Sequence, residues 1–343
     1  MKKLSFFNRI AFYLNLVSSL ALLLACIVPY TNSASLAFFS LAVPGLVLIN
    51  LFFVLYWLLR KRALVVIPIA VYLYWYITLG SFITFNISPK PIGEHTSLNI
   101  MTYNTLGFRG KEDDWESTAG DSIVAFINTE KPDIVCFQEY DYMKMDKDSF
   151  KGYPYSSVDS EFGKNDTRLY QAIYSKHRII DVGYLEFGNT YNSSVYADVL
   201  VKSDTLRLYS VHLQSLNIRP WNLKSERSDR LFARLRRSFE KQQQQTEIIR
   251  KHMDSSPYTN IVVGDFNNNQ YSSVYFNLKR DLKDTFIEKG NGYGATINFW
   301  KFPFRIDFIL VDPSLEVLSH QNYTINLSDH EPIMASIKIP RNK

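Results

Sequence analysis

The N-terminal quarter of the chain contains no acidic residue, which restricts the surroundings in which it can fold. Residues 1–86 have no Asp or Glu, and their only charges are those of Lys2, Lys3, Arg9, Arg60, Lys61 and Arg62. Three uncharged apolar runs lie between these residues, at about 10–30, 36–59 and 63–85. Each is about long enough to cross a bilayer, which takes roughly 20 apolar residues. The sequence therefore predicts a membrane domain of three transmembrane helices over residues 1–86, rather than a cleaved signal peptide.

The basic residues predict the orientation of these helices. Three of them precede the first run, and the cluster Arg60-Lys61-Arg62 separates the second run from the third. The loop between the first two runs, residues 31–35, carries no charge. Since positive loops stay on the cytoplasmic side, the N-terminus is expected in the cytoplasm. With three crossings, everything after residue 85 would be extracytoplasmic, on the periplasmic side of the inner membrane if the chain is bacterial.

The rest of the chain is nearly neutral. It holds 32 basic and 33 acidic residues, a formal net charge of −1. This disfavours the broad basic surface that holds long nucleic acids. One stretch, residues 219–251, has ten basic and four acidic residues. We interpret it as the solvated face of a helix, and docking on anionic lipid headgroups is the alternative.

The two cysteines do not suggest a disulfide framework. Cys26 falls in the first apolar run and Cys136 in an apolar segment typical of a strand. Both are interpreted as small core residues.

From residue 97 onward the pattern is one of short strands alternating with helices. Helices are predicted at about 122–128 and 225–252. Strands are predicted at about 98–103, 134–137, 170–174, 194–201, 206–211, 261–263, 306–311 and 331–339. Connections this short favour one mixed α/β domain over residues 97–343, joined to the membrane domain by a linker at 87–96.

Polar residues follow one predicted strand after another. They are Asn104, Glu139, His212, Asp265 with Asn267, Asp307, and Asp329 with His330. Each alone has a plain structural explanation: Asn and Asp are common in turns, and Asp307 could pair with Arg305. A series of polar residues at successive strand ends is harder to explain in this way. Strand ends converge on one rim of a packed sheet, and binding and catalytic sites are built there.

The ordered set resembles the endonuclease/exonuclease/phosphatase superfamily, which includes deoxyribonucleases, neutral sphingomyelinases and inositol-polyphosphate phosphatases. Six segments carry the resemblance, with Gly292-Tyr-Gly-Ala-Thr296 as a further match. They are Met101-Thr-Tyr-Asn104, Phe137-Gln-Glu139, Ser210-Val-His-Leu213, Gly264-Asp-Phe-Asn-Asn268, Arg305-Ile-Asp-Phe308 and Ser328-Asp-His330. The resemblance implies a four-layer α-β-β-α sandwich with its site at one end of the two sheets, in a membrane-anchored, bacterial-type member.

The resemblance also implies a divalent cation. Glu139 is the expected anchor for Mg²⁺ or Mn²⁺, and Asp329 and Asn104 would complete or flank the site. Carboxylate, amide and water oxygens suit these hard ions.

The remaining residues are expected to act on the phosphoester. Asp265 is the candidate general base or water-orienting carboxylate. Asn267 would hold a phosphate oxygen, with Asn104 as a further substrate contact. His330, kept cationic by Asp307, would stabilise developing charge. His212 would contact the phosphate or protonate the leaving group.

These assignments predict a membrane-anchored, metal-dependent phosphoesterase that hydrolyses phosphodiester or phosphomonoester bonds by in-line attack of an activated water. The expected substrate is a lipid headgroup or a small phosphodiester, the lipid bilayer is the second partner, and no obligate protein partner is inferred. An extracytoplasmic nuclease on DNA or RNA and a catalytically inactive binding module are the alternatives. The segment 169–172 offers no carboxylate partner for His212.

Overall fold

A computed structural model describes most of the chain. The described residues are 4–86, 97–145, 147–158, 169–188, 190, 192–218, 227–299 and 302–340. The predicted linker at 87–96 and the first part of the basic stretch, 219–226, lie outside them.

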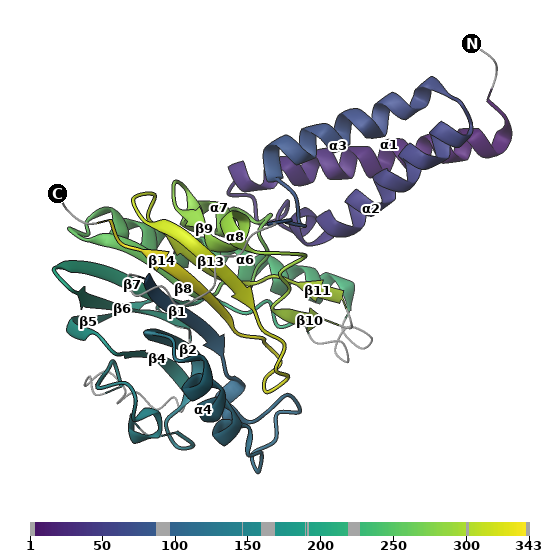
Figure 1. The fold of residues 1–343 in the computed structure, drawn as a ribbon. Coiled ribbons are helices and arrows are strands. Elements are labelled where there is room, and N and C mark those ends of the chain that lie inside the picture. Colours follow the sequence, from purple (N-terminus) through teal and green to yellow (C-terminus); the bar gives the residue numbers. More distant parts are fainter. Residues whose placement is uncertain are drawn as a thin grey trace. The chain divides into compact units, whose positions relative to one another are not determined.

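Two compact units make up the chain (Figure 1). The helical unit consists of residues 1–82 together with Asn269–Phe276. The sandwich unit consists of residues 83–268 and 277–343.

The helical unit contains three apolar helices, α1 (Phe6–Ile27), α2 (Phe38–Leu59) and α3 (Val66–Leu79), with the short 3-10 turns η1 (Val28–Tyr30) and η2 (Ala63–Val65). Two stretches, Phe6–Tyr30 and Phe38–Leu59, are long and apolar enough to cross a membrane. Both match predicted spans in position.

The third predicted span is wrong in its extent. The helical stretch runs only from Ala63 to Leu79, which is shorter than the other two. It ends because Gly80 adopts a left-handed φ of 74°, a common way for a helix to stop. The chain is extended soon after, where Thr84 and Gly292 exchange two backbone hydrogen bonds of 2.9 Å.

Buried amides and hydroxyls join α1 to α2. Ser19 Oγ donates to Asn50 Oδ1 (2.8 Å), and Trp57 Nε1 donates to Asn15 Oδ1 (3.1 Å). Large apolar side chains such as Leu59 and Ile77 are exposed on the outside. Polar groups inside and apolar groups outside are typical of helices packed in lipid.

The sandwich unit is a mixed α/β fold with two six-stranded sheets packed face to face, as predicted. The first sheet has the order β13-β14-β1-β2-β4-β3 and the second β5-β6-β7-β8-β12-β9. The first-sheet strands are β1 (Ser97–Asn104), β2 (Ile134–Asp141), β3 (Tyr155–Ser156), β4 (Leu169–Ser175), β13 (Glu316–Asn322) and β14 (Ile333–Lys338). The second-sheet strands are β5 (Arg178–Glu186), β6 (Ser193–Val201), β7 (Asp204–His212), β8 (Thr259–Asp265), β9 (Lys283–Asp284) and β12 (Asp307–Val311).

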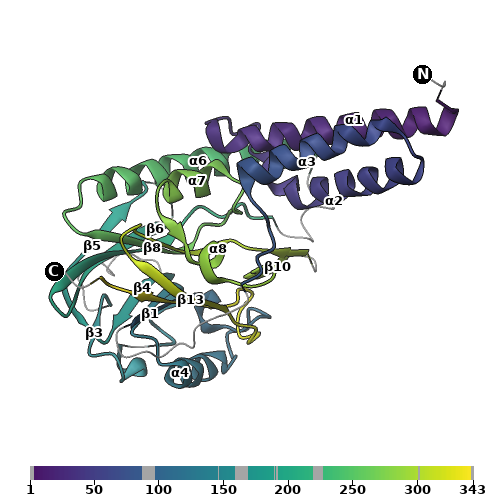
Figure 2. The ribbon, with the colours of Figure 1, turned by 45° about the horizontal axis from the view of Figure 1, so that its top comes forward.

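Helices cover the outer faces of both sheets (Figure 2). The first sheet is covered by α4 (Ala119–Glu130), whose Ile123 and Ile127 join a buried aromatic cluster, and the second by α6 (Ser228–Asp254). The remaining elements are short: η3 (Leu106–Phe108), η4 (Lys147–Phe150), α7 (Ser273–Lys279), α8 (Thr285–Lys289), β10 (Ile297–Phe299) and β11 (Phe302–Phe304).

The main core lies between the sheets. Residues from both, such as Ile100 and Ile134 of the first and Val199 and Ile261 of the second, form one fully buried aliphatic cluster. Removing this area from water stabilises the sandwich by about 25 cal/mol for each Å² of apolar surface. The strands are therefore held rigidly enough to fix the side chains at their ends.

The ten predicted strands and helices are present. Seven of them are longer than predicted, by one to five residues, and β12, β14 and α6 are one to three residues shorter. Two long strands, β5 and β13, were not predicted. Most of β5 is exposed or half-buried, and β13 buries the polar Ser319 and His320, so neither shows a clear alternation of apolar and polar residues.

Gly264 lets two parallel strands approach at the site. Its φ is 131°, and a Cβ there would lie 2.1 Å from the Val211 carbonyl oxygen. We expect Gly264→Ala to lower the free energy of unfolding by roughly 3 kcal/mol, from backbone strain and lost β7–β8 pairing. Gly152→Ala is the control, since a Cβ there meets nothing within 4 Å. Denaturant melts of both variants test this, and equal midpoints would contradict it.

Candidate active site

The strand ends bring the predicted residues together from both sheets. Asn104 ends β1 and Glu139 lies near the end of the neighbouring parallel strand β2. In the second sheet His212 ends β7 and is paired with Asp265 at the end of the parallel strand β8. The antiparallel strand β12 begins with Asp307, opposite Asp265. Register alone therefore places Asp265 between His212 and Asp307.

The side chain of Asp265 is the centre of the site. Its Oδ2 accepts hydrogen bonds from Asn104 Nδ2 (3.1 Å) and Asn267 Nδ2 (3.2 Å). The same oxygen lies 3.7 Å from His212 Nε2 and 3.6 Å from His330 Nε2. Asp265 Oδ1 accepts from the Asn267 backbone N–H (2.7 Å). One carboxylate thus contacts four of the predicted site residues.

Burial makes this carboxylate basic. Asp265 is 1% exposed, and its pKa is raised to about 6, with burial as the largest cause. The nearby Asp307 contributes to this rise, whereas His330 and His212 oppose it. An aspartate in this range can accept a proton from water near neutral pH.

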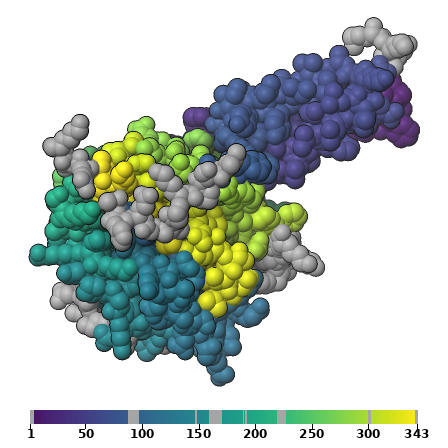
Figure 3. Space-filling view, viewed as in Figure 1, coloured from purple at the N-terminus to yellow at the C-terminus, as the bar shows by residue number. Residues whose placement is uncertain are grey.

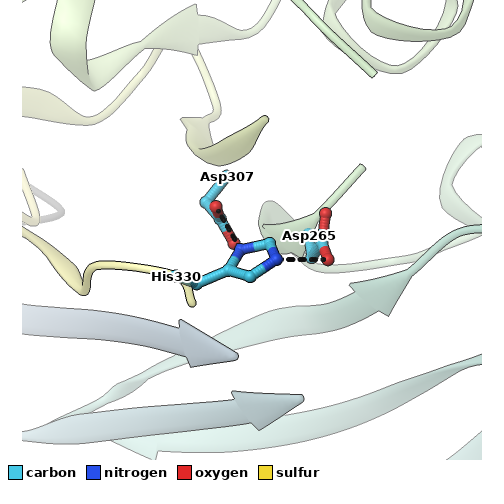
Figure 4. Close-up of side chains that lie close together, drawn as sticks. All are labelled: Asp265, Asp307 and His330. Carbon is cyan, nitrogen blue, oxygen red and sulfur yellow. Dashed lines mark hydrogen bonds and ion pairs between the residues drawn. The ribbon is translucent and has the colours of Figure 1, made fainter. Parts of the chain in front are cut away.

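His330 bridges two buried carboxylates (Figure 4). Its Nδ1 is hydrogen-bonded to Asp307 Oδ2 at 2.9 Å, and its Nε2 faces Asp265. Burial by itself would lower the pKa of His330, but Asp307 and Asp265 more than offset this and raise the pKa well above its usual value. The two carboxylates therefore favour the protonated form of His330, whose Nε2 faces the centre of the site.

The alternative partner for Asp307 is excluded by the structure. Arg305 Nη1 donates to both carboxylate oxygens of the buried Asp284 (3.0 and 2.8 Å), and the guanidinium lies over the rings of Phe286 and Phe308. Arg305 is therefore paired with Asp284, and Asp307 is paired with His330.

Asn267 supports Asp265 more directly than the sequence suggested. It has a left-handed φ of 50°, which asparagine tolerates. Its Nδ2 donates to the Leu213 carbonyl (2.9 Å) as well as to Asp265. Both amide hydrogens are therefore engaged, and Asn267 would have to exchange one bond to hold a phosphate oxygen.

His212 faces two carboxylates through the same nitrogen. Its Nε2 lies 3.7 Å from Glu139 Oε1 and from Asp265 Oδ2. The buried Gln171, in the segment where a carboxylate partner was sought, donates instead to the carbonyl and hydroxyl of Ser193. Within the described residues, Glu139 and Asp265 are the only acids found beside His212.

Glu139 and Asn104 form the more open side of the site. Asn104 Nδ2 donates to Glu139 Oε1 (3.2 Å), and the Glu139 side chain is 24% exposed. Glu139 has a φ of 50°, at a bulge in the pairing of β2 with β4. The bulge turns the carboxylate out of the ladder, a common role of bulges beside sites.

Asp329 lies next to Ser328, which is hydrogen-bonded to Asn104 on the open side of the site. Ser328 Oγ donates to the Asn104 carbonyl (2.9 Å), and Asp329 itself is exposed. The loop before it, in yellow, lies against the loop after Asn104, in blue, where Lys111 Nζ donates to Asn326 Oδ1 at 3.1 Å (Figure 3). In the described structure, the Asp329 carboxylate has no hydrogen bond to Asn104 or Glu139.

Comparison with known proteins identifies a family for the region that contains the site. The profile of the Endonuclease/Exonuclease/phosphatase family matches residues 101–330, two thirds of the chain. The chain belongs to this family. A second profile, Domain of unknown function (DUF8431), matches residues 8–82. No curated protein matches the chain.

Several solved structures share the sandwich. A family protein from Bacteroides thetaiotaomicron is 18% identical, with a TM-score of 0.54 over 71% of this chain and 98% of its own. The mannosyl-6-phosphatase of the same species is 17% identical (TM-score 0.53; 70% and 99% covered). The catalytic domain of human Nocturnin with bound sulfate is also 17% identical (TM-score 0.52; 72% and 94% covered). At this identity the likeness shows the fold alone.

Family members typically use divalent metals, and two groups of this chain could hold one. Asp265, Asp307 and His330 offer ligand atoms within 4.8 Å of one another, but all three are buried and His330 Nδ1 is bonded to Asp307. Glu139 with Asn104 offers oxygen atoms on the open side. Mg²⁺ usually keeps several waters, so the open side suits it better. The donor types thus fit a hard cation at Glu139.

Gln242 also supports the site, and the sequence patterns did not predict this role. Gln242, fully buried on α6, donates to the carbonyls of Phe266 (3.5 Å) and Asn267 (3.2 Å) and accepts from Asn268 Nδ2 (2.8 Å). The sequence held a signal: Gln242 follows Phe239 by three residues, on the apolar stripe of the helix. A glutamine on a buried stripe needs polar partners inside the protein.

Asp307 should set the charge of His330. We expect Asp307→Asn to lower the pKa of His330, because the imidazolium loses its nearest carboxylate while its burial is unchanged. Nuclear magnetic resonance titration of the ring protons gives both pKa values. Glu316→Gln, an exposed change on β13, is the control and should leave the titration unchanged. An unaltered His330 titration in Asp307→Asn would refute the assignment.

Proposed function

We propose that the chain is a membrane-anchored, divalent-metal-dependent phosphoesterase that hydrolyses phosphodiester or phosphomonoester bonds by attack of an activated water. The observation that carries this proposal is the position of Asp265 Oδ2, in contact with two amides and facing two imidazoles. Such a carboxylate can take a proton beside groups that bind an anion.

In this proposal Asp265 orients the attacking water and accepts its proton. His330 Nε2–H stabilises negative charge on the phosphoryl oxygens, and Asp307 keeps it cationic. His212 contacts the phosphate or protonates the leaving oxygen. Asn104 and Asn267 hold Asp265 in place and offer amide hydrogens to the phosphate when they exchange partners. Preorganised donors of this kind supply much of the rate enhancement in such reactions.

Glu139, with Asn104 and Asp329, would hold Mg²⁺ or Mn²⁺. The cation would neutralise phosphoryl charge, which a site with this many carboxylates needs in order to bind an anionic substrate.

We favour a small or lipid-linked phosphoester over a long nucleic acid. The sequence after residue 86 has a formal net charge of −1, so it offers no excess of cations along which a polyanion could lie. A nuclease acting on DNA or RNA and a binding module without activity are the competing functions.

The first test uses the purified full chain and bis(para-nitrophenyl) phosphate. We expect Mg²⁺-dependent hydrolysis, and we expect Glu139→Gln to raise the Mg²⁺ concentration for half-maximal rate by roughly 10- to 100-fold. Glu240→Gln, an acid on the outer face of α6, is the matched control. Activity that resists chelators would overturn the metal assignment, and no activity with any metal would favour the binding module.

The same preparation separates the substrate classes. Lipid phosphodiesters in mixed micelles, sugar phosphates and plasmid DNA are compared at equal phosphate concentration. Faster cleavage of the lipid or sugar phosphoester supports the proposal, and faster cleavage of DNA would replace it with the nuclease.

We further propose that the sandwich unit faces away from the cytoplasm. The short helix α3 supports this, because its C-terminal residues Trp75 and Leu79 pack in one cluster with Cys26 near the end of α1 and Val43 near the start of α2. Within the helical unit, α3 therefore ends level with the uncharged loop between α1 and α2. We expect a C-terminal alkaline phosphatase fusion in a bacterial host to be active and a green fluorescent protein fusion to be dark. The reverse pattern would place the unit in the cytoplasm.

A further inference from the structure

The segment Asn269–Phe276 begins two residues after Asn267, yet it belongs to the helical unit. Strand β8 ends at Asp265, and the chain passes through Asn268 directly into this segment. It returns to the sandwich unit at Asn277. A family profile covers the region but does not explain why eight residues beside the site should lie among apolar helices.

Tyr271 is the apolar anchor of the segment. It is 2% exposed and lies in a cluster with residues from all three helices. The cluster contains Leu22, Ala25 and Cys26 of α1, Val43 and Val47 of α2, and Val71, Trp75 and Leu79 of α3. Phe276 adds an edge contact with Tyr30, with ring centroids 6.1 Å apart. A large aromatic side chain buried in this way contributes strongly to holding a segment in place.

Asn269 is the polar anchor, and its partner is made by a proline. Pro44 lies inside α2 and has no backbone N–H, so the carbonyl of Ser40, four residues earlier, lacks its helical donor. Asn269 Nδ2 donates to that carbonyl at 2.9 Å, in a buried position. An unpaired carbonyl buried among apolar helices costs about as much as a lost hydrogen bond. The Asn269 amide therefore fills a defect built into α2.

The segment is also rigid in itself. Asn269 Oδ1 accepts from the Tyr271 N–H (3.0 Å), and the Asn269 carbonyl accepts from Ser272 Oγ (2.7 Å). Ser272 Oγ in turn accepts from the Tyr275 N–H (3.2 Å). Asn269 is thus fixed at both ends of its side chain, so a displacement at one end of the turn moves the whole turn.

We propose that Asn269 and Tyr271 are positioning residues, through which the helical unit holds the active-site strand exit. The chain from Asp265 to Asn269 spans four peptide bonds. Gln242 binds it within the sandwich unit, and the helices bind it at Asn269. Two fixed ends leave Asn267 little freedom in its left-handed conformation, and Asn267 holds both oxygens of Asp265. The apolar helices then serve the reaction as well as the anchoring of the chain.

The first test does not depend on any activity. A protease site is inserted between Phe82 and Ile83 of the full chain, so that Thr84 and its partner Gly292 stay in the same fragment. The chain carries an N-terminal affinity tag and is purified in detergent. After cleavage and a high-salt wash, we expect the C-terminal fragment to remain on the affinity resin. With Asn269→Leu and Tyr271→Ala together, the fragment should be released. Release of the unaltered fragment, or retention of the altered one, would overturn the proposal.

The second test measures whether the contact of Asn269 with α2 affects turnover, and it rests on the proposed phosphoesterase function. We expect Asn269→Leu to lower both the melting temperature and kcat, the latter by roughly 10- to 100-fold, with little change in KM. Adding Pro44→Ala restores an N–H for the Ser40 carbonyl. The double variant should therefore recover its melting temperature while kcat stays low.

The control is Asn50→Leu, which removes a buried amide that bonds only to residues of α1 and α2 in the described structure. It should lower the melting temperature and leave kcat unchanged. If kcat recovers together with stability in the double variant, Asn269 is merely structural and the positioning role fails. If the unaltered chain has no phosphoesterase activity, the proposed function fails, and the fragment-retention test still decides the anchoring.

Discussion

The contacts of Asp265 Oδ2 hold the site together. Four side chains from four separate segments, Asn104, His212, Asn267 and His330, meet at this one oxygen. It can be buried there because β8 is hydrogen-bonded to β7 on one side and β12 on the other. The close approach of β7 and β8 requires Gly264, since any side chain would meet the Val211 carbonyl. The aliphatic core between the sheets thus serves the chemistry by fixing where strands end.

Charge is divided between a closed and an open side of the site. On the closed side, one imidazolium lies between the carboxylates of Asp307 and Asp265, an arrangement that offsets the cost of burying charge. On the open side, Glu139 stays partly exposed and suits a hydrated cation. The proposed phosphoesterase would need both, because its substrate is an anion and the attacking water must lose a proton.

The helical unit shows how a local defect can specify a distant contact. Pro44 leaves a carbonyl without a donor in an apolar helix, and an asparagine more than two hundred residues away supplies it. The residues next to Pro44 and next to Asn269 in the sequence do not indicate this contact. Together they connect the helices to the segment that follows the site.

The sequence by itself determined the elements and the chemical inventory. Strand positions followed from apolar and polar alternation, and the site residues followed from polar types at strand ends, whose convergence is a general property of packed sheets. Where alternation was weak, as in β5 and β13, the strands were not predicted. The predicted third span was too long, because the end of α3 depends on one glycine and on pairing with Gly292, far along the chain. Only tertiary structure could decide that Arg305 pairs with Asp284 and not Asp307, that Gln242 supports Asn267, and that Asn269 bonds to Ser40. Each of these contacts joins residues that are far apart in the chain and share no helix or strand periodicity. Their pairing is therefore determined by tertiary packing.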